Sequence, residues 1–147
     1  MIPMIEQVSV FLENSAGRLA ELTRALGDAD VDMRALMVAD TEEFGVVRII
    51  ADSPHRAKEV LDEQGFSVTL TPVIAVEVPQ RPGGLADVLE ALGSAGVNVE
   101  YAYCFVEPSG EAAVDVLKVD DSVAEDALRS AGFRVLDAAD VYAPDAG

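Results

Sequence analysis

Apolar residues along the chain follow two spacings, and each spacing predicts a different kind of element. In Val8–Leu12 every second residue points to the same face, which is typical of a strand with one buried face. Leu19, Leu22 and Leu26 follow at a spacing that places them on one face of a helix. The two patterns predict strands at 8–12, 31–40, 46–51, 66–71, 73–78, 97–106, 112–119 and 133–142, and helices near 19–26, at 54–64, about 84–95 and 121–131, the last capped by Asp120.

The order of these elements repeats, because the second half of the chain copies the apolar pattern of the first at an offset of 66 residues. Val8–Leu12 aligns with Ile74–Val78, and Gly17 aligns with Gly83. The turn glycines, the helix faces and the strand faces all match in the same order. We therefore interpret the chain as a tandem duplication.

Each half has the order βαββαβ, which is typical of the ferredoxin-like arrangement of an antiparallel sheet with two helices on one face. The predicted class is α+β, with one domain at 1–72, a second at 73–147, and Pro72 between them. Phe11, Leu36 and Val38 are predicted to lie on the sheet face without helices. We expect that face to pack against the sister unit or another subunit.

The net charge of the chain disfavours some classes of binding partner. A formal net charge of −17 disfavours binding to nucleic acid and to anionic membranes, since both need a basic surface. One cysteine allows no internal disulfide, and neither a signal peptide nor a stretch of about 18 apolar residues is found. We expect a cytoplasmic protein with no bound metal and no cofactor.

Residues that commonly carry catalysis are few. His55 is the single histidine and stands at a predicted helix start, where we expect it to be exposed. Cys104 lies within an alternating strand, where a packed thiol is expected, and no second cysteine could complete a metal site. The carboxylates form no pair that stands out from the acidic background. The sequence therefore favours binding over catalysis.

One loop, Gln80–Leu85, has the features of a binding site for a small anion. Pro82 stiffens the approach, Gly83 and Gly84 free the backbone, and a helix follows, so that its positive end and its unpaired amides gather at one point. Arg81 adds a cation that can hold a carboxylate with two hydrogen bonds. The corresponding segment of the first half, Asn14–Leu19, lacks the Arg-Pro pair.

The segment Gln80-Arg81-Pro82-Gly83-Gly84-Leu85, followed by Gly96-Val97-Asn98-Val99 and a tyrosine-bearing strand, resembles an ACT domain. It is most similar to the serine-binding ACT domain of phosphoglycerate dehydrogenases. The first half, with Asp30-Val31-Asp32-Met33 after its loop, resembles the family more loosely. The resemblance covers almost the whole chain.

The resemblance implies a site between two units, in which one loop holds the carboxylate of an amino acid and a strand start holds its ammonium group. Side chains of Met33, Ala35, Tyr101 and Tyr103 are candidates for the pocket around the ligand. The implied ligand-binding residues are Gln80, Arg81, Pro82, Gly83, Gly84, Leu85 and Asn98, with the weaker equivalents Asn14, Ala16, Gly17, Arg18, Leu19 and Asp32.

The resulting hypothesis is an amino-acid sensor without an enzyme domain, expected to form a homodimer and to act on a regulated biosynthetic enzyme. One alternative is an assembly module that binds no ligand, and a side-chain-filled cleft beside Gly83 would favour it. Another is a small ferredoxin-like hydrolase, such as an acyl-phosphate hydrolase, which also has an arginine in the loop after its first strand.

Overall fold

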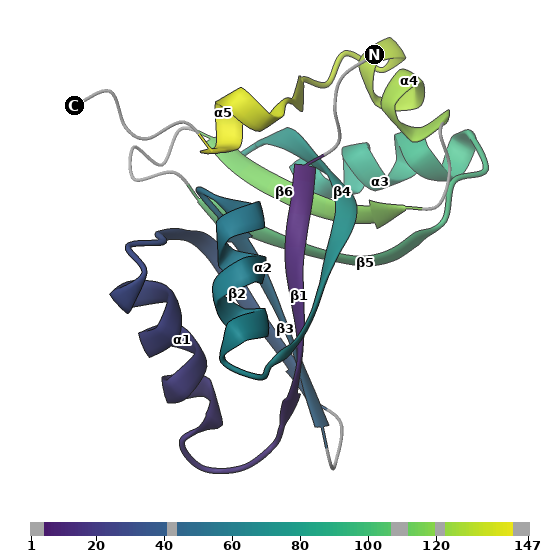
Figure 1. Cartoon of the computed structure of the whole chain (residues 1–147). Helices are drawn as coiled ribbons and strands as arrows, with labels where there is room; N and C mark the ends of the chain where they lie inside the picture. The colour runs from purple at the N-terminus through teal and green to yellow at the C-terminus, as the bar shows by residue number, and fades with distance from the viewer. Residues whose placement is uncertain (1–4, 41–43, 107–111, 120–122, 143–147) are drawn as a thin grey trace. The chain divides into compact units, whose positions relative to one another are not determined.

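The computed structural model describes residues 5–40, 44–106, 112–119 and 123–142, and divides into two compact units. One unit contains Glu6–Pro72 and the described residues from Ala139 on, and the other contains Val73–Ala138 and Ile5. Figure 1 shows the elements, which are β1 (Ile5–Glu13), α1 (Arg18–Asp28), β2 (Met33–Asp40), β3 (Phe44–Ala51), α2 (Pro54–Glu63), β4 (Ser67–Pro79), α3 (Gly84–Ser94), β5 (Val99–Val106), β6 (Ala112–Val119), α4 (Val123–Ser130), β7 (Val135–Leu136) and α5 (Ala138–Tyr142).

The strands of both units follow the ferredoxin-like order. In the Glu6–Pro72 unit the order is β2-β3-β1-β4, and in the Val73–Ala138 unit β5 and β6 are followed by β4 and β7. The recorded registers are antiparallel, with Val10 opposite Val47 in the first unit and Val76 opposite Asp115 in the second. The predicted α+β class and the tandem ferredoxin-like units are confirmed.

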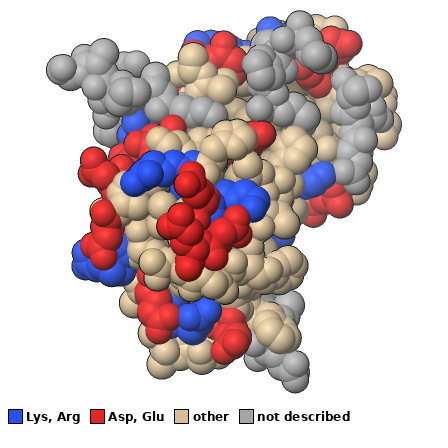
Figure 2. Space-filling model, in the orientation of Figure 1, with Lys and Arg blue, Asp and Glu red and all other residues tan. Residues whose placement is uncertain are grey.

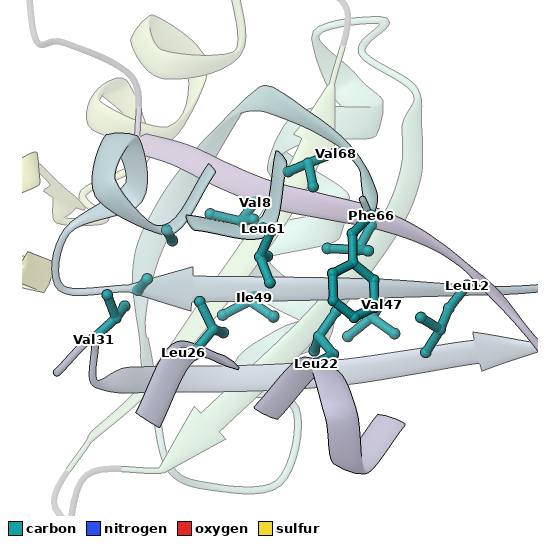
Figure 3. Packing of buried hydrophobic residues seen from close by; sticks show 13 residues of the cluster. Val8, Leu12, Leu22, Leu26, Val31, Val47, Ile49, Leu61, Phe66 and Val68 are labelled. Carbon is teal, nitrogen blue, oxygen red and sulfur yellow. The ribbon is translucent and has the colours of Figure 1, made fainter. Parts of the chain in front are cut away.

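The core of the first unit lies between its sheet and its two helices. Figure 3 shows Leu22 and Leu26 of α1 and Leu61 of α2 directed at Ile49 in β3, as their spacing along the helices predicts. All four side chains are buried. The equivalent cluster of the second unit includes Val76, Val88, Leu92, Leu117, Leu128 and Val135.

The last predicted strand, 133–142, is wrong over most of its length. Only Val135–Leu136 pairs with β4, and the helix α5 begins at Ala138. Asp137 occupies the position before that helix, and aspartate is a preferred residue there, while the alanines that follow are strong helix formers. The predicted cap at Asp120 lies outside the described residues.

The two strands predicted at 66–71 and 73–78 form one continuous strand. Both segments belong to β4, and the division between the units falls at Pro72 within that strand. A proline lacks a backbone donor and therefore fits where the pairing partners of a strand change.

A register shift in β2 changes the faces on which its side chains lie from those predicted. The register shifts between Met33 and Ala35, and beyond this point Leu36 lies opposite Ile49 and Val38 opposite Val47. Opposed residues of neighbouring strands share a face, so Leu36 and Val38 lie on the side of the sheet that carries the helices. Their predicted place beside Phe11 is therefore wrong, although all three are exposed.

Charged side chains of opposite sign stand next to one another on the face that Figure 2 shows. Arg24 pairs with Asp28 on α1, and Lys58 pairs with Asp62 on α2 at 2.6 Å. Some of the acidic side chains on these two helices are thus paired with basic ones. No helix in the described part of the chain is long and apolar enough to cross a membrane.

Candidate functional site

The Gln80–Leu85 loop forms a tight turn from β4 into α3. Gly83 has a left-handed backbone with φ of 86°, which glycine adopts without steric cost. The Arg81 amide donates to the Pro79 carbonyl at 2.9 Å, and the Gly84 amide donates to the Arg81 carbonyl at 3.0 Å. The loop is therefore held by its own backbone before any ligand binds.

Gly84 is required by a close approach. It is buried, and a Cβ atom at this position would collide with the carbonyl oxygen of Pro79. The first turn of α3 can therefore pack onto the end of β4 only with glycine here. The loop and the helix start are thereby fixed relative to the strand.

Arg81 lies at the rim of this loop, where it is half exposed. One guanidinium nitrogen pairs with the carboxylate of Asp87 at 2.7 Å, and another donates to the Pro82 carbonyl at 3.3 Å. These contacts hold the side chain against its own helix. A bound carboxylate would share the guanidinium with Asp87.

A cavity of about 420 Å³ opens beside the loop, within the Val73–Ala138 unit. Pockets that hold small molecules range over about 300–1,000 Å³, so an amino acid fits in this volume. Most of the lining is apolar. The lining residues are Val78, Pro79, Gln80, Arg81, Pro82, Leu85, Cys104, Ala113 and Asp115.

Asp115 is the buried acid of this cavity. It lies on β6 opposite Val76 and Cys104, its residue is 2% exposed, and its Oδ2 has no hydrogen-bond partner among the described residues. Burial raises the pKa of the carboxyl from 3.8 to about 6, because the charged form loses its hydration. The raised pKa lies close to neutral pH, and the carboxyl makes no ion pair with the described residues.

The first unit has a matching but smaller cavity of about 100 Å³. The Gly17 backbone has φ of 87°, and the Ser15 amide donates to the Glu13 carbonyl at 2.9 Å, as the equivalent groups of the second loop do. The paired lining residues are Leu12 and Val78, Glu13 and Pro79, Asn14 and Gln80, Ser15 and Arg81, Leu19 and Leu85, Val38 and Cys104, Gly45 and Ala113, and Val47 and Asp115.

The predicted loop residues divide between lining and supporting positions. Gln80, Arg81, Pro82 and Leu85 line the larger cavity, while Gly83 and Gly84 shape the turn beside it. In the first unit Asn14 and Leu19 line the smaller cavity, and Ala16, Gly17 and Arg18 do not.

Arg18 takes part in the packing of its own unit. Its guanidinium lies 4.8 Å from the centre of the Phe66 ring, and one nitrogen pairs with Glu21 at 2.6 Å. Arg18 follows the left-handed glycine of its loop, whereas Arg81 precedes that of the second. The two arginines therefore do not occupy equivalent positions.

The predicted strand residues lie away from the loop of their own unit. Asn98 precedes β5 and is six residues from Cys104, which corresponds to about 20 Å along a strand. Asp32 stands at the same distance from Val38, and its carboxylate contacts Arg34 at 3.2 Å. A role for Asn98 or Asp32 as a partner of a loop in another unit stays a prediction.

The sequence did not point to the residues on the floor of the larger cavity. Tyr101 and Tyr103 were candidates, but Tyr103 lies opposite Val116 and so faces the side of the sheet away from Asp115. Cys104 lines the cavity and is exposed, contrary to the expected packed thiol. Aligning Val47 with Asp115 across the repeat would have revealed the buried acid.

Comparison with known proteins places this geometry in a family. Residues 3–135 match the family of ACT domain pairs. The crystal structure of protein BT0572 from Bacteroides thetaiotaomicron is 33% identical, with a TM-score of 0.91 over 97% of this chain and 99% of the other. No curated protein shows significant sequence similarity to the chain.

Two more distant structures share the fold. The ligand-free regulatory subunit of aspartate kinase from Thermus thermophilus is 19% identical, with a TM-score of 0.66 over 88% of this chain and 93% of that one. The regulatory subunit from Thermus flavus is 18% identical, with a TM-score of 0.65 over 89% and 92%.

Replacing Gly84 by alanine should force the first turn of α3 away from Pro79. We expect Gly84→Ala to lower the free energy of unfolding by about 1–3 kcal/mol, as overpacking does. Gly93→Ala on the same helix is the control, since its Cβ would meet nothing within 4 Å, and it should stabilise the protein by up to about 1 kcal/mol. Urea denaturation measures both, and equal effects would contradict the close approach.

Asp115 should make stability depend on pH. The folded chain holds this proton more tightly than the unfolded chain, so the free energy of unfolding falls as pH rises through about 4–6, by at most about 3 kcal/mol. Asp115→Asn carries no titrating proton and should gain about 1–3 kcal/mol relative to the parent between pH 4 and pH 8. Urea denaturation of the parent and of Asp115→Asn at pH 4 and pH 8 measures the gain. A difference in the free energy of unfolding that is the same at both pH values would contradict the buried charge.

Proposed function

The chain belongs to the family of ACT domain pairs, and we propose that it is a regulatory protein that binds a free amino acid and catalyses no reaction. The observation that carries the proposal is the cavity beside the Gln80–Leu85 loop. A ligand there meets the Arg81 guanidinium at the rim and apolar walls formed by Val78, Leu85 and Ala113. This combination suits a small molecule with a carboxylate and a modest side chain.

The helix start adds hydrogen-bond donors to this site. The amides of Leu85 and Ala86 have no hydrogen-bond partner among the described residues, as is usual in the first turn of a helix. Leu85 and Arg81 line the cavity, so the Leu85 amide and the Arg81 guanidinium are the donors that we propose for a carboxylate. An open cavity at this position also weighs against the assembly module, for which a filled cleft was the expected sign.

Regulation would follow from differential binding. A ligand shifts a protein toward the state that it binds better, and a partner can respond to that shift. We propose that the partner is a separate biosynthetic enzyme and that the chain acts as a homodimer in the cytoplasm. The structures from Thermus are regulatory subunits of aspartate kinase, and they offer a precedent for this arrangement at the level of the fold.

Calorimetric titration with each of the twenty amino acids tests the function. At least one should bind with a dissociation constant below about a millimolar, equivalent to roughly −4 kcal/mol. Cys104 is the only cysteine of the chain and lines the cavity, so alkylation by iodoacetamide reports occupancy at this place. The bound amino acid should slow the alkylation. Absence of binding by all twenty would refute the proposal.

Arg81→Ala should weaken this binding by about 1–3 kcal/mol, or roughly 5- to 150-fold, because a charged hydrogen bond to the carboxylate is lost. Asp87→Asn is the matched variant, since it removes the competing partner of Arg81 and should leave affinity unchanged or raise it. Titration of both variants with the amino acid found above measures the effect. Unchanged affinity in Arg81→Ala would place the carboxylate elsewhere.

A further inference from the structure

The position of Asp115 is occupied by an apolar residue in the first unit. In the first unit the equivalent residue is Val47, which lies opposite Val10 and Val38 and is fully buried in the core. Asp115 lies in the same way opposite Val76 and Cys104. Packing alone is thus satisfied by valine, and the carboxylate in the second unit needs another explanation.

Among the described residues Asp115 makes no ion pair. Its Oδ2 is buried without a hydrogen-bond partner in the described ranges, and the side chain lines the cavity. The charged or titratable groups that line the cavity with it are Arg81 and Cys104, and Arg81 already pairs with Asp87. The cross-strand neighbour on β4 is Val76, and α3 contributes Leu85, so neither element adds a charge.

An ionised carboxylate in an apolar cavity costs free energy unless a cation with hydrogen-bond donors reaches it. A primary ammonium group meets this need, because it is compact, positively charged and offers three donors. The rim holds Arg81 and the interior holds Asp115, so the cavity presents a cation and an anion to one ligand. A zwitterion matches both.

We propose that Asp115 receives the ammonium group of a small primary amine in the cavity of the Val73–Ala138 unit, and that the Val47 cavity does not hold such a ligand. The inference rests on the proposed function, since it names the Asp115 carboxylate as the group that holds the ammonium of the bound amino acid. It also makes this cavity a complete site for a zwitterion within one unit. The smaller volume in the first unit, about 100 Å³ against 420 Å³, agrees with this asymmetry.

The test titrates the full chain with each amino acid, and with isoamylamine as an amine that lacks a carboxylate, at pH 8 and pH 5. The parent is compared with Asp115→Asn, Asp115→Val and the control Asp126→Asn, an exposed position on α4. Every amino acid that binds at pH 8 should lose at least tenfold in affinity in both Asp115 variants, and nothing in the control. The same molecule without its amino group should not bind.

The charge of Asp115 also predicts how the affinity depends on pH. Protonation of Asp115, whose pKa is about 6, removes the partner of the ammonium group, so the affinity of the parent should fall about tenfold from pH 8 to pH 5. The fall should be absent in Asp115→Asn. Circular dichroism spectra that match the parent show that the variants are folded.

The outcomes separate this inference from the proposed function. If amino acids bind but Asp115→Asn keeps affinity within threefold, the inference is overturned and the proposed function stands. If no amino acid binds but isoamylamine slows alkylation of Cys104 only when Asp115 is present, the proposed function fails and the inference stands. If neither compound class binds, both are overturned.

Discussion

The approach of the α3 helix start to the end of β4 is the constraint on which the candidate site depends. Gly83 supplies a left-handed turn, and Gly84 allows the helix to pack against Pro79. Side chains before and after the turn, among them Arg81 and Leu85, are thereby directed to one cavity. The first unit builds the same left-handed turn at Gly17 but has Arg18 where the second has Gly84, so the turn is common to both units and the close approach belongs to the second.

Duplication within one chain provides an internal comparison. Backbone geometry, helix faces and core clusters agree between the two units. The cavities differ, because Ser15 and Val47 of the first unit stand where the second has Arg81 and Asp115. Both replacements introduce a charge, of opposite sign, at residues that line the same cavity. Such a change is costly for a structural element and is consistent with a unit adapted to a zwitterionic ligand.

Much of the fold could be predicted because its signals are local. The spacing of Leu22 and Leu26 and the recurring turn glycines identify helices, turns and the repeat. The place of Cys104 on the cavity floor could not be predicted, because a register shift in β5 between Val99 and Tyr101 changes which of its residues face the helices. The alternation of Val114, Asp115 and Val116 is typical of a strand with its acid on an exposed face, whereas all three residues are buried. The pairing of Asp115 with Val76, which matches that of Val47 with Val10 in the first unit, identifies it as a core position.

A buried, unpaired carboxylate also links binding to stability. In the free protein the Asp115 charge disfavours the folded unit, since its hydration is lost without compensation. A cationic group that enters the cavity compensates the lost hydration of the carboxylate. Because it binds the folded state, it also stabilises that state by mass action. The free and bound forms of the Val73–Ala138 unit then differ in stability more than the contacts at the loop alone would produce. The first unit has Val47 at this position, so the proposed link between binding and stability belongs to the second unit.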